Sequence, residues 1–154
     1  MIKIKNILFP TDFSPCADYA LKYAISFATE YNAKLYLLHA IHQMNVAVGP
    51  GGMAYPVLKA YEDMEKEAKK KLQELLTHHV PESIHGENII VQGVPFMEII
   101  TFAKKHEIDL ITIATHGRTG LSHMLMGSTA EKVARKAPCP VLCVKHPDYK
   151  FVLP

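Results

Sequence analysis

Short apolar runs alternate with amphipathic helical stripes along this chain, and that alternation limits the available folds more than any other feature. Runs typical of β-strands occupy residues 4–9, 34–41, 88–92, 110–114 and 141–145. Helical stripes occupy residues 15–32, 57–78 and 128–137, and another follows Gly93. Because alternating strands and helices form βαβ units, we expect an α/β protein with a mainly parallel sheet and right-handed crossovers. Residues 110–114 are almost wholly apolar, as in a central strand buried on both faces.

Length and composition are those of one globular domain, residues 1–154. The chain is 49% hydrophobic and 21% charged, which is ordinary for a protein with a buried core. A net charge of +2 is too small to indicate a nucleic-acid partner. No apolar run reaches the ~18 residues of a membrane span, and the N-terminal residues do not resemble a signal peptide. Three cysteines, an odd number, indicate buried reduced thiols. We therefore expect a cytoplasmic protein with no nucleic-acid or membrane partner.

The segments that directly follow the expected strands are the candidates for a functional site. Open parallel sheets bind ligands at the carboxyl ends of their strands, where the strand order reverses. These segments are Pro10-Thr11-Asp12 and residues 40–42, 93–95 and 114–120.

The segment 114–120 reads Ala-Thr-His-Gly-Arg-Thr-Gly, and residues 127–129, Gly-Ser-Thr, follow it. Glycines let backbone N–H groups approach a ligand closely, and a helix that begins at the second cluster would attract an anion. The two clusters could therefore hold a chain of phosphates, with further donors from Arg118 and the hydroxyl groups. A capping box, in which Ser128 closes the helix and Glu131 bonds back, is the alternative. Spacing alone leaves both interpretations open.

Other nucleotide signatures and metal sites are not indicated. The sequence has no G-x-x-x-x-G-K-[ST] loop, and no G-x-G-x-x-G follows the first strand. Asp12 suggests a receiver domain, but the third strand ends in Gln92-Gly93, with no aspartate to phosphorylate. Nine histidines are scattered without the spacing of a zinc site, so we expect no metal held by protein side chains.

Six segments carry a resemblance that covers nearly the whole chain in order. They are residues 7–14 (Ile-Leu-Phe-Pro-Thr-Asp-Phe-Ser), 39–41 (His-Ala-Ile), 91–95 (Val-Gln-Gly-Val-Pro), 114–120, 127–128 and 137–141 (Ala-Pro-Cys-Pro-Val). Together they resemble the universal stress protein family, whose ATP-binding members carry G-x2-G-x9-G-[ST]. That motif falls on Ala114, Gly117, Gly127 and Ser128, with alanine in place of the first glycine. A positive φ at 114 would penalise alanine, whereas an ordinary strand end would not. We expect the strand end.

The resemblance implies an open, doubly wound, five-stranded parallel sheet in the order 3-2-1-4-5, with helices on both faces. It also implies ATP as the cofactor, with Mg or Mn bound through the phosphates. By this resemblance, adenosine would contact Pro10, Thr11, Asp12 and Ala40. The phosphates would be held by Gly117, Gly127, Ser128 and Thr129. The expected nucleotide-binding residues are Pro10, Thr11, Asp12, Ala40, Ala114, His116, Gly117, Arg118, Gly120, Gly127, Ser128 and Thr129.

The function that the resemblance implies is that of a binding protein whose ATP occupancy regulates a stress response, with little or no hydrolysis. The sequence identifies no catalytic residue. One alternative is a slow ATPase or a self-phosphorylating enzyme with Ser128 or Thr129 as the acceptor. Another is a dimeric scaffold of the same family that binds no nucleotide, for which Ala114 is the main argument.

The last strand, from Val141 to Lys145, would lie at a sheet edge in the implied order. An apolar edge strand with little charge pairs readily with another chain, and two-fold dimers are the commonest oligomers. The resemblance points the same way, so we expect a homodimer through this strand, which Val144→Pro should weaken by removing a ladder donor. In the alternative, the tail 146–154 folds back over the edge of a monomer.

Overall fold

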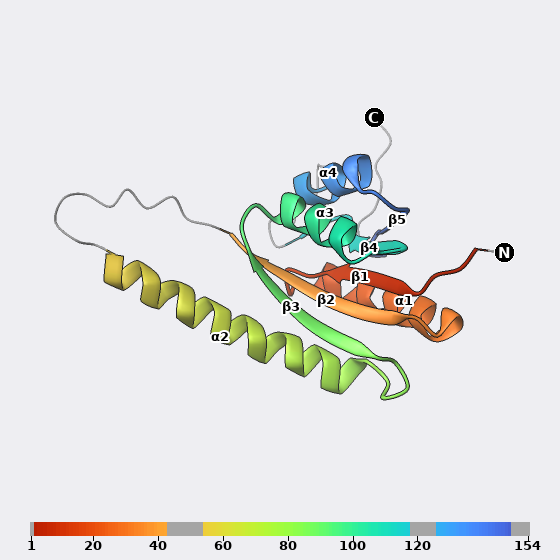
Figure 1. Cartoon of the computed structure of the whole chain (residues 1–154), viewed down its shortest axis with the longest axis horizontal. Helices are drawn as coiled ribbons and strands as arrows, with labels where there is room; N and C mark the ends of the chain where they lie inside the picture. The colour runs from red at the N-terminus through yellow and green to blue at the C-terminus, as the bar shows by residue number, and fades with distance from the viewer. Residues whose placement is uncertain (1, 43–53, 118–125, 149–154) are drawn as a thin grey trace.

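The computed structural model describes residues 2–42, 54–117 and 126–148, and strands alternate with helices along them (Figure 1). The strands are β1 (Asn6–Pro10), β2 (Lys34–Ile41), β3 (Gly86–Gln92), β4 (Leu110–Ala114) and β5 (Val141–Val144). The helices are α1 (Pro15–Tyr31), α2 (Ala54–His79), α3 (Pro95–Lys105) and α4 (Ser128–Lys136).

The strands form one parallel sheet in the order β3-β2-β1-β4-β5, so the expected order is confirmed. The order reverses at β1, which pairs with β2 on one side and with β4 on the other. The carboxyl ends of these three strands therefore meet at the switch point, where open α/β sheets bind ligands.

Helices cover both faces of the sheet. Side chains of α1 and α2 form one core with Ile7, Phe9 and other strand residues. Side chains of α3 and α4 form a second core with Leu8 and Ile111. Successive side chains of a strand point to opposite faces, and Ile7, Leu8 and Phe9 are all fully buried. β1 is thus buried on both faces, and all five residues of β4 are buried too, as the almost wholly apolar sequence of residues 110–114 predicts.

Helix α1 begins where the sequence predicts. Ser14 is its N-cap, and the Ser14 hydroxyl accepts a hydrogen bond from the Ala17 N–H at 3.2 Å. Pro15 follows in the first turn, where its missing N–H costs nothing. This fixed start determines how the chain turns between β1 and α1, and that turn borders the site described below.

Three strands differ from expectation in their boundaries, and one of them, the last strand, ends at Val144 rather than at residue 145. The first strand was expected at residues 4–9 but runs from Asn6 to Pro10. Before it begins, Asp109 Oδ2 accepts hydrogen bonds from the Lys5 and Asn6 N–H groups at 2.7 and 2.9 Å, so a carboxylate takes the place of a ladder partner. The third strand begins at Gly86 rather than at residue 88, because Gly86 is already paired with Leu35.

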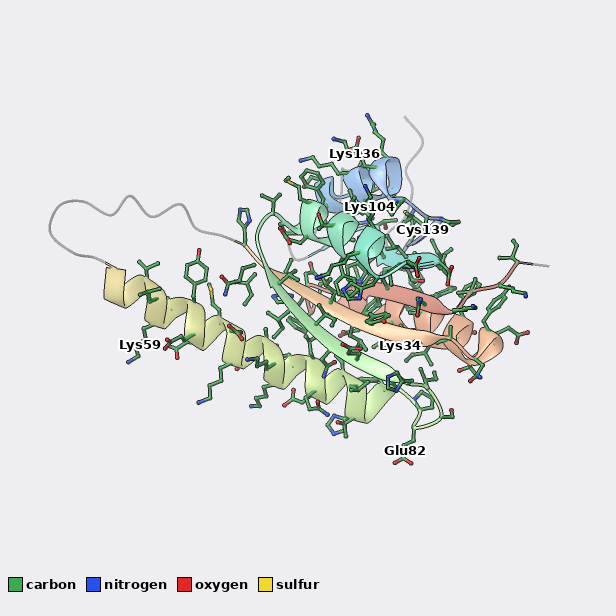
Figure 2. All side chains as sticks on the ribbon, viewed as in Figure 1. Lys34, Lys59, Glu82, Lys104, Lys136 and Cys139 are labelled. Carbon is green, nitrogen blue, oxygen red and sulfur yellow. The ribbon has the colours of Figure 1, made fainter. Side chains whose placement is uncertain are left out.

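Helix α2 is longer than the sheet beneath it. Its 26 residues span about 39 Å, whereas the seven residues of β3 span about 23 Å. Figure 1 shows its N-terminal part beyond the strands, and Lys59 projects from its outer side in Figure 2. The periodicity of this helix predicts Met64 on its inward face, but Met64 is 45% exposed. Among the described residues, no helix is long and apolar enough to cross a membrane.

All three cysteines are free thiols. Cys16 is buried as expected, but Cys143 of the edge strand and Cys139, which precedes that strand, are only half-buried. Burial raises the pKa of both edge thiols, and the negative charge of Asp109 raises the pKa of Cys139 further. A raised pKa lowers the thiolate fraction, so both thiols are poor nucleophiles.

The hydroxyl of Thr112 is buried in β4, and its Oγ1 has no hydrogen-bond partner among the described residues. An unpaired buried hydroxyl costs roughly 1–3 kcal/mol of desolvation, and valine has the same shape without the oxygen. We expect Thr112→Val to raise the free energy of unfolding by about 1 kcal/mol, measured by urea denaturation. Thr112→Ser keeps the oxygen, loses a methyl group and should be less stable than wild type. A valine variant less stable than wild type would contradict the expectation.

Candidate functional site

A cavity of about 330 Å³ opens at the carboxyl ends of β1, β2 and β4. Its size falls in the range of roughly 300–1,000 Å³ that is usual for small-molecule sites. The walls come from the ends of these strands, the first turn of α4, and single turns of α1 and α3. The cavity therefore lies at the switch point of the sheet.

The expected site residues gather around this cavity wherever the structure describes them. Those that line it are Pro10, Thr11, Asp12, Ala40, Ala114, His116, Gly117, Gly127, Ser128 and Thr129. They come from four separate segments of the sequence, which the strand order and the position of the start of α4 bring together. Arg118 and Gly120 lie outside the described residues.

Backbone and side-chain hydrogen bonds hold the turn after β1 in place. The Thr11 N–H donates to the Leu38 carbonyl at 2.8 Å and extends the β1–β2 ladder. Thr11 Oγ1 accepts from the Phe13 N–H, and Asp12 Oδ1 accepts from the Ser14 N–H, both at 3.0 Å. Such bonds are typical of turns that Thr and Asp side chains stabilise. The turn leads directly into the cap of α1 and keeps Asp12 at the cavity.

Phe13, in this turn, has a φ of 60°, which bulky residues rarely adopt. A residue in such a conformation costs on the order of 1–3 kcal/mol and persists only where its surroundings impose it. The Phe13 ring packs against the His39 ring of β2, with 4.5 Å between centroids. From α2, Lys71 Nζ lies 5.6 Å from the centre of the Phe13 ring. Two neighbouring elements thus contact the strained residue.

Ala114 ends β4 in an ordinary strand conformation. The non-glycine residues with positive φ in the described part of the chain do not include Ala114. The expected strand end is confirmed, and alanine carries no backbone penalty there. Next to it, Thr115 and His116 are buried, with Thr115 Oγ1 and His116 Nδ1 3.0 Å apart. The chain thus continues from β4 into the cavity wall as a buried polar pair.

Gly117 lies against the Asp12 carboxylate. A Cβ atom at position 117 would overlap Asp12 Oδ2, so any larger residue there would displace the carboxylate that accepts from the Ser14 N–H. This approach joins the turn after β1 to the loop after β4, across the switch point of the sheet.

Helix α4 begins at the cavity with Gly127 as its N-cap. The Gly127 N–H donates to the Thr115 carbonyl at 2.7 Å and anchors the helix start to the end of β4. The capping-box interpretation is wrong, because Ser128 is the first helical residue and Glu131 Oε1 accepts from Arg135 at 2.8 Å. Ser128 lines the cavity instead. The start of α4 brings N–H donors and a partial positive charge to the cavity.

Sequence reasoning missed most of the apolar wall of the cavity, to which Leu38, Ile99 and Ile113 contribute, although Pro95 of the candidate segment 93–95 also lines it. Periodicity marks such residues as buried but does not tell which buried residue faces a ligand cavity. His39 was missed as a site residue too, although it begins one of the segments that carry the family resemblance.

The sequence model of the universal stress protein family matches residues 3–145. Universal stress protein MJ0531 of Methanocaldococcus jannaschii is 36% identical over 144 residues, which cover 93% of this chain and 83% of that protein. Universal stress protein MJ0577 of the same organism is 35% identical over 162 residues, covering 94% and 97%. The similarity thus includes every segment that lines the cavity.

Solved structures share the fold. The structure of hypothetical protein MJ0577 has a TM-score of 0.85 at 33% identity and covers 96% of this chain and 99% of its own. A universal stress protein in complex with cAMP has a TM-score of 0.68 at 23% identity, covering 93% and 98%. One from Archaeoglobus fulgidus in complex with dAMP has a TM-score of 0.56 at 22% identity, also covering 93% and 98%. At these two lower identities the likeness concerns the fold alone.

Proposed function

This chain belongs to the universal stress protein family, and from that premise we propose that it is an ATP-binding regulatory protein of the stress response. ATP would occupy the cavity at the carboxyl ends of β1, β2 and β4, with little or no hydrolysis. The observation that carries the proposal is the convergence of the expected nucleotide residues from four separate segments on one cavity.

The strand side of the cavity fits a nucleoside. Ala40 is small enough to admit a flat ring, and Leu38 and Ile113 provide apolar surface beside it. Asp12 supplies a carboxylate that can accept hydrogen bonds from ribose hydroxyls or from an adenine amino group. These residues would therefore hold the adenosine part of ATP.

The helix side of the cavity fits phosphates. Gly117 has a bare backbone in a place where a Cβ atom would overlap Asp12. Gly127, Ser128 and Thr129 surround the start of α4, where unpaired N–H groups favour an anion. ATP would bring a chain of negative charge to this end. Among the described residues no group of three His, Cys, Asp or Glu could hold a metal ion, so Mg or Mn would be held mainly by the phosphate oxygens.

The structures with cAMP and dAMP support an adenine nucleotide as the ligand class, since both proteins have this fold and both ligands carry adenine. That the ligand is a triphosphate is a further step of the proposal. This step rests on the start of α4 and on Gly117 after β4.

Thermal unfolding with and without ATP–magnesium tests the proposal. A ligand that binds only the native state at 100 times its Kd stabilises it by about 2.7 kcal/mol. For a domain of this size we expect a rise in melting temperature of roughly 5–11 °C. Magnesium alone is the control and should produce no comparable rise. An unchanged melting temperature at millimolar ATP–magnesium would contradict ATP binding.

The ordinary backbone at Ala114 removes the main argument for a scaffold that binds no nucleotide. Hydrolysis is a separate question, which phosphate release at saturating ATP answers. We expect ATP to remain intact over many binding and release events.

We also propose that the protein forms a two-fold homodimer through β5, in the cytoplasm. β5 lies at the edge of the sheet and consists of Val, Leu, Cys and Val. An open apolar edge is stabilised by pairing with a second strand. Three free thiols fit a reducing compartment. In the alternative, the tail 146–154 folds back over this edge in a monomer. Residues 149–154 of that tail lie outside the described residues.

The ladder between β4 and β5 shows which residues face the open edge. The Val144 carbonyl accepts from the Thr115 N–H at 2.9 Å, and the Pro140 carbonyl accepts from the Ile111 N–H at 3.0 Å. Backbone groups of successive strand residues point to alternate edges, so those of Cys143 face outward. Val144→Pro is therefore the wrong test of the dimer, because it would disrupt the β4–β5 ladder within one copy.

A further inference from the structure

His39, near the carboxyl end of β2, contacts the turn after β1 in two ways. His39 Nδ1 lies 2.8 Å from the Thr11 carbonyl oxygen. A carbonyl oxygen can only accept, so Nδ1 carries the hydrogen and donates it. The imidazole ring also packs on the Phe13 ring, at 4.5 Å between centroids and 35° between planes. One side chain of β2 thus contacts both the first and the third residue of the turn.

The turn needs outside support because Phe13 is in the left-handed region. The other non-glycine residues with positive φ in the described part are Asn32 and Glu107. Asn32 is the C-cap of α1 and Glu107 follows the C-cap of α3, which are usual places for such a conformation. Phe13 instead lies just before a helix begins. Without support, its backbone would relax toward the commoner negative φ.

Asp12 depends on that conformation because it lies between Thr11 and Phe13. Asp12 Oδ1 accepts from the Ser14 N–H at 3.0 Å, and Oδ2 lies where a Cβ atom of residue 117 would be. Rotation of the Phe13 backbone would turn the Ser14 N–H away and release the carboxylate from its place at the cavity. The position of Asp12 is therefore coupled to the support that the turn receives.

We propose that His39 is a positioning residue of the nucleotide site. Chiefly through its hydrogen bond to Thr11, and to a smaller degree through its ring contact with Phe13, it holds the Asp12 carboxylate beside Gly117. The inference rests on the proposed nucleotide binding, because it concerns how that site is formed.

Two variants separate the hydrogen bond from the ring contact. In His39→Asn the side-chain Nδ2 is as many bonds from Cβ as the histidine Nδ1, so the donor to Thr11 is kept while most of the ring is lost. In His39→Phe the aromatic contact with Phe13 is kept and the donor is lost. His79→Asn, at the exposed C-terminal end of α2, is the matched control.

Isothermal titration calorimetry would give Kd for ATP–magnesium and for adenosine. We expect His39→Phe to weaken the binding of both ligands about tenfold, because Asp12 would serve the nucleoside in each. We expect His39→Asn to stay within about threefold of wild type and His79→Asn to be unchanged. A lower melting temperature for His39→Phe with an unchanged Kd would overturn the proposal, since His39 would then be merely structural. Equal losses in the two His39 variants would overturn it as well.

Amide hydrogen exchange measured by NMR reads the turn without any ligand. We expect His39→Phe, but not His39→Asn, to speed exchange of the Phe13 and Ser14 amides, which donate to Thr11 and Asp12. Unchanged exchange in His39→Phe would overturn the proposal. If wild type bound neither ATP nor adenosine, the proposed function would fail, and the exchange rates would still decide whether His39 holds the turn.

Discussion

Replacing Gly127 by valine together with Ser128 by alanine is expected to weaken ATP binding at least about 100-fold, which corresponds to about 2.7 kcal/mol. A Cβ atom at position 127 would lie 3.3 Å from the Thr115 carbonyl oxygen and 3.9 Å from His116 Cα, so there is little room beyond alanine. The valine methyl groups would push on the end of β4 or enter the cavity where phosphates would approach. The second substitution removes a hydroxyl at the start of α4.

Titration calorimetry with ATP–magnesium would measure the loss, and circular dichroism would show that the double variant is folded. Ser128→Ala alone should cost only severalfold in affinity, because the backbone N–H groups of the helix start remain. Ser26→Ala, on the exposed side of α1, removes a hydroxyl far from the cavity and serves as the control. Wild-type affinity in a folded double variant would refute the assignment of phosphates to this end of the cavity.

Cys143→Pro is expected to convert a dimer into a monomer at micromolar concentration. The Cys143 N–H faces the open edge of β5, so proline there removes a donor to the second copy and leaves the β4–β5 ladder intact. Proline also favours an extended conformation in the residue before it, which suits Leu142 in the strand. Sedimentation velocity would measure the change.

Two further substitutions serve as controls for this prediction. Cys143→Ala removes the same thiol but keeps the backbone N–H, so it should remain dimeric. Val144→Pro should instead lower the melting temperature, because Val144 pairs with Ala114 inside the sheet. A wild-type monomer, or a Cys143→Pro variant that remains dimeric, would rule out pairing through β5.

Sequence patterns predicted the fold well because each apolar run or helical stripe is longer than the error in its predicted boundaries. The four residues of β5 and the five of β4 stand out as apolar runs, and the cap of α1 follows from Ser14 and Pro15 alone. The length of α2 past the sheet was not predictable in this way. Its apolar stripe continues to Met64 whether or not a sheet lies beneath it.

The N-cap of α4 could not be predicted from local sequence patterns. Ser128 and Glu131 fit a capping box by spacing, but the helix is capped one residue earlier because Gly127 is anchored to the Thr115 carbonyl of β4. That choice depends on a contact between segments, which spacing does not contain. The conformation of Phe13 is harder still to predict, because it contradicts the preference of a bulky residue and exists only through neighbours such as His39.

During synthesis, β1 is made before both of the strands that pair with it, and the second of these, β4, follows much later. Ile7 pairs with Leu110, so roughly 100 residues separate the partners, which a ribosome makes in about 5–20 s. Meanwhile one edge of a wholly buried strand stays open, as in chains prone to aggregate. The cavity is complete only after Gly127 and Ser128 have followed β4. If ATP binds there, it stabilises finished chains and leaves truncated ones to quality control.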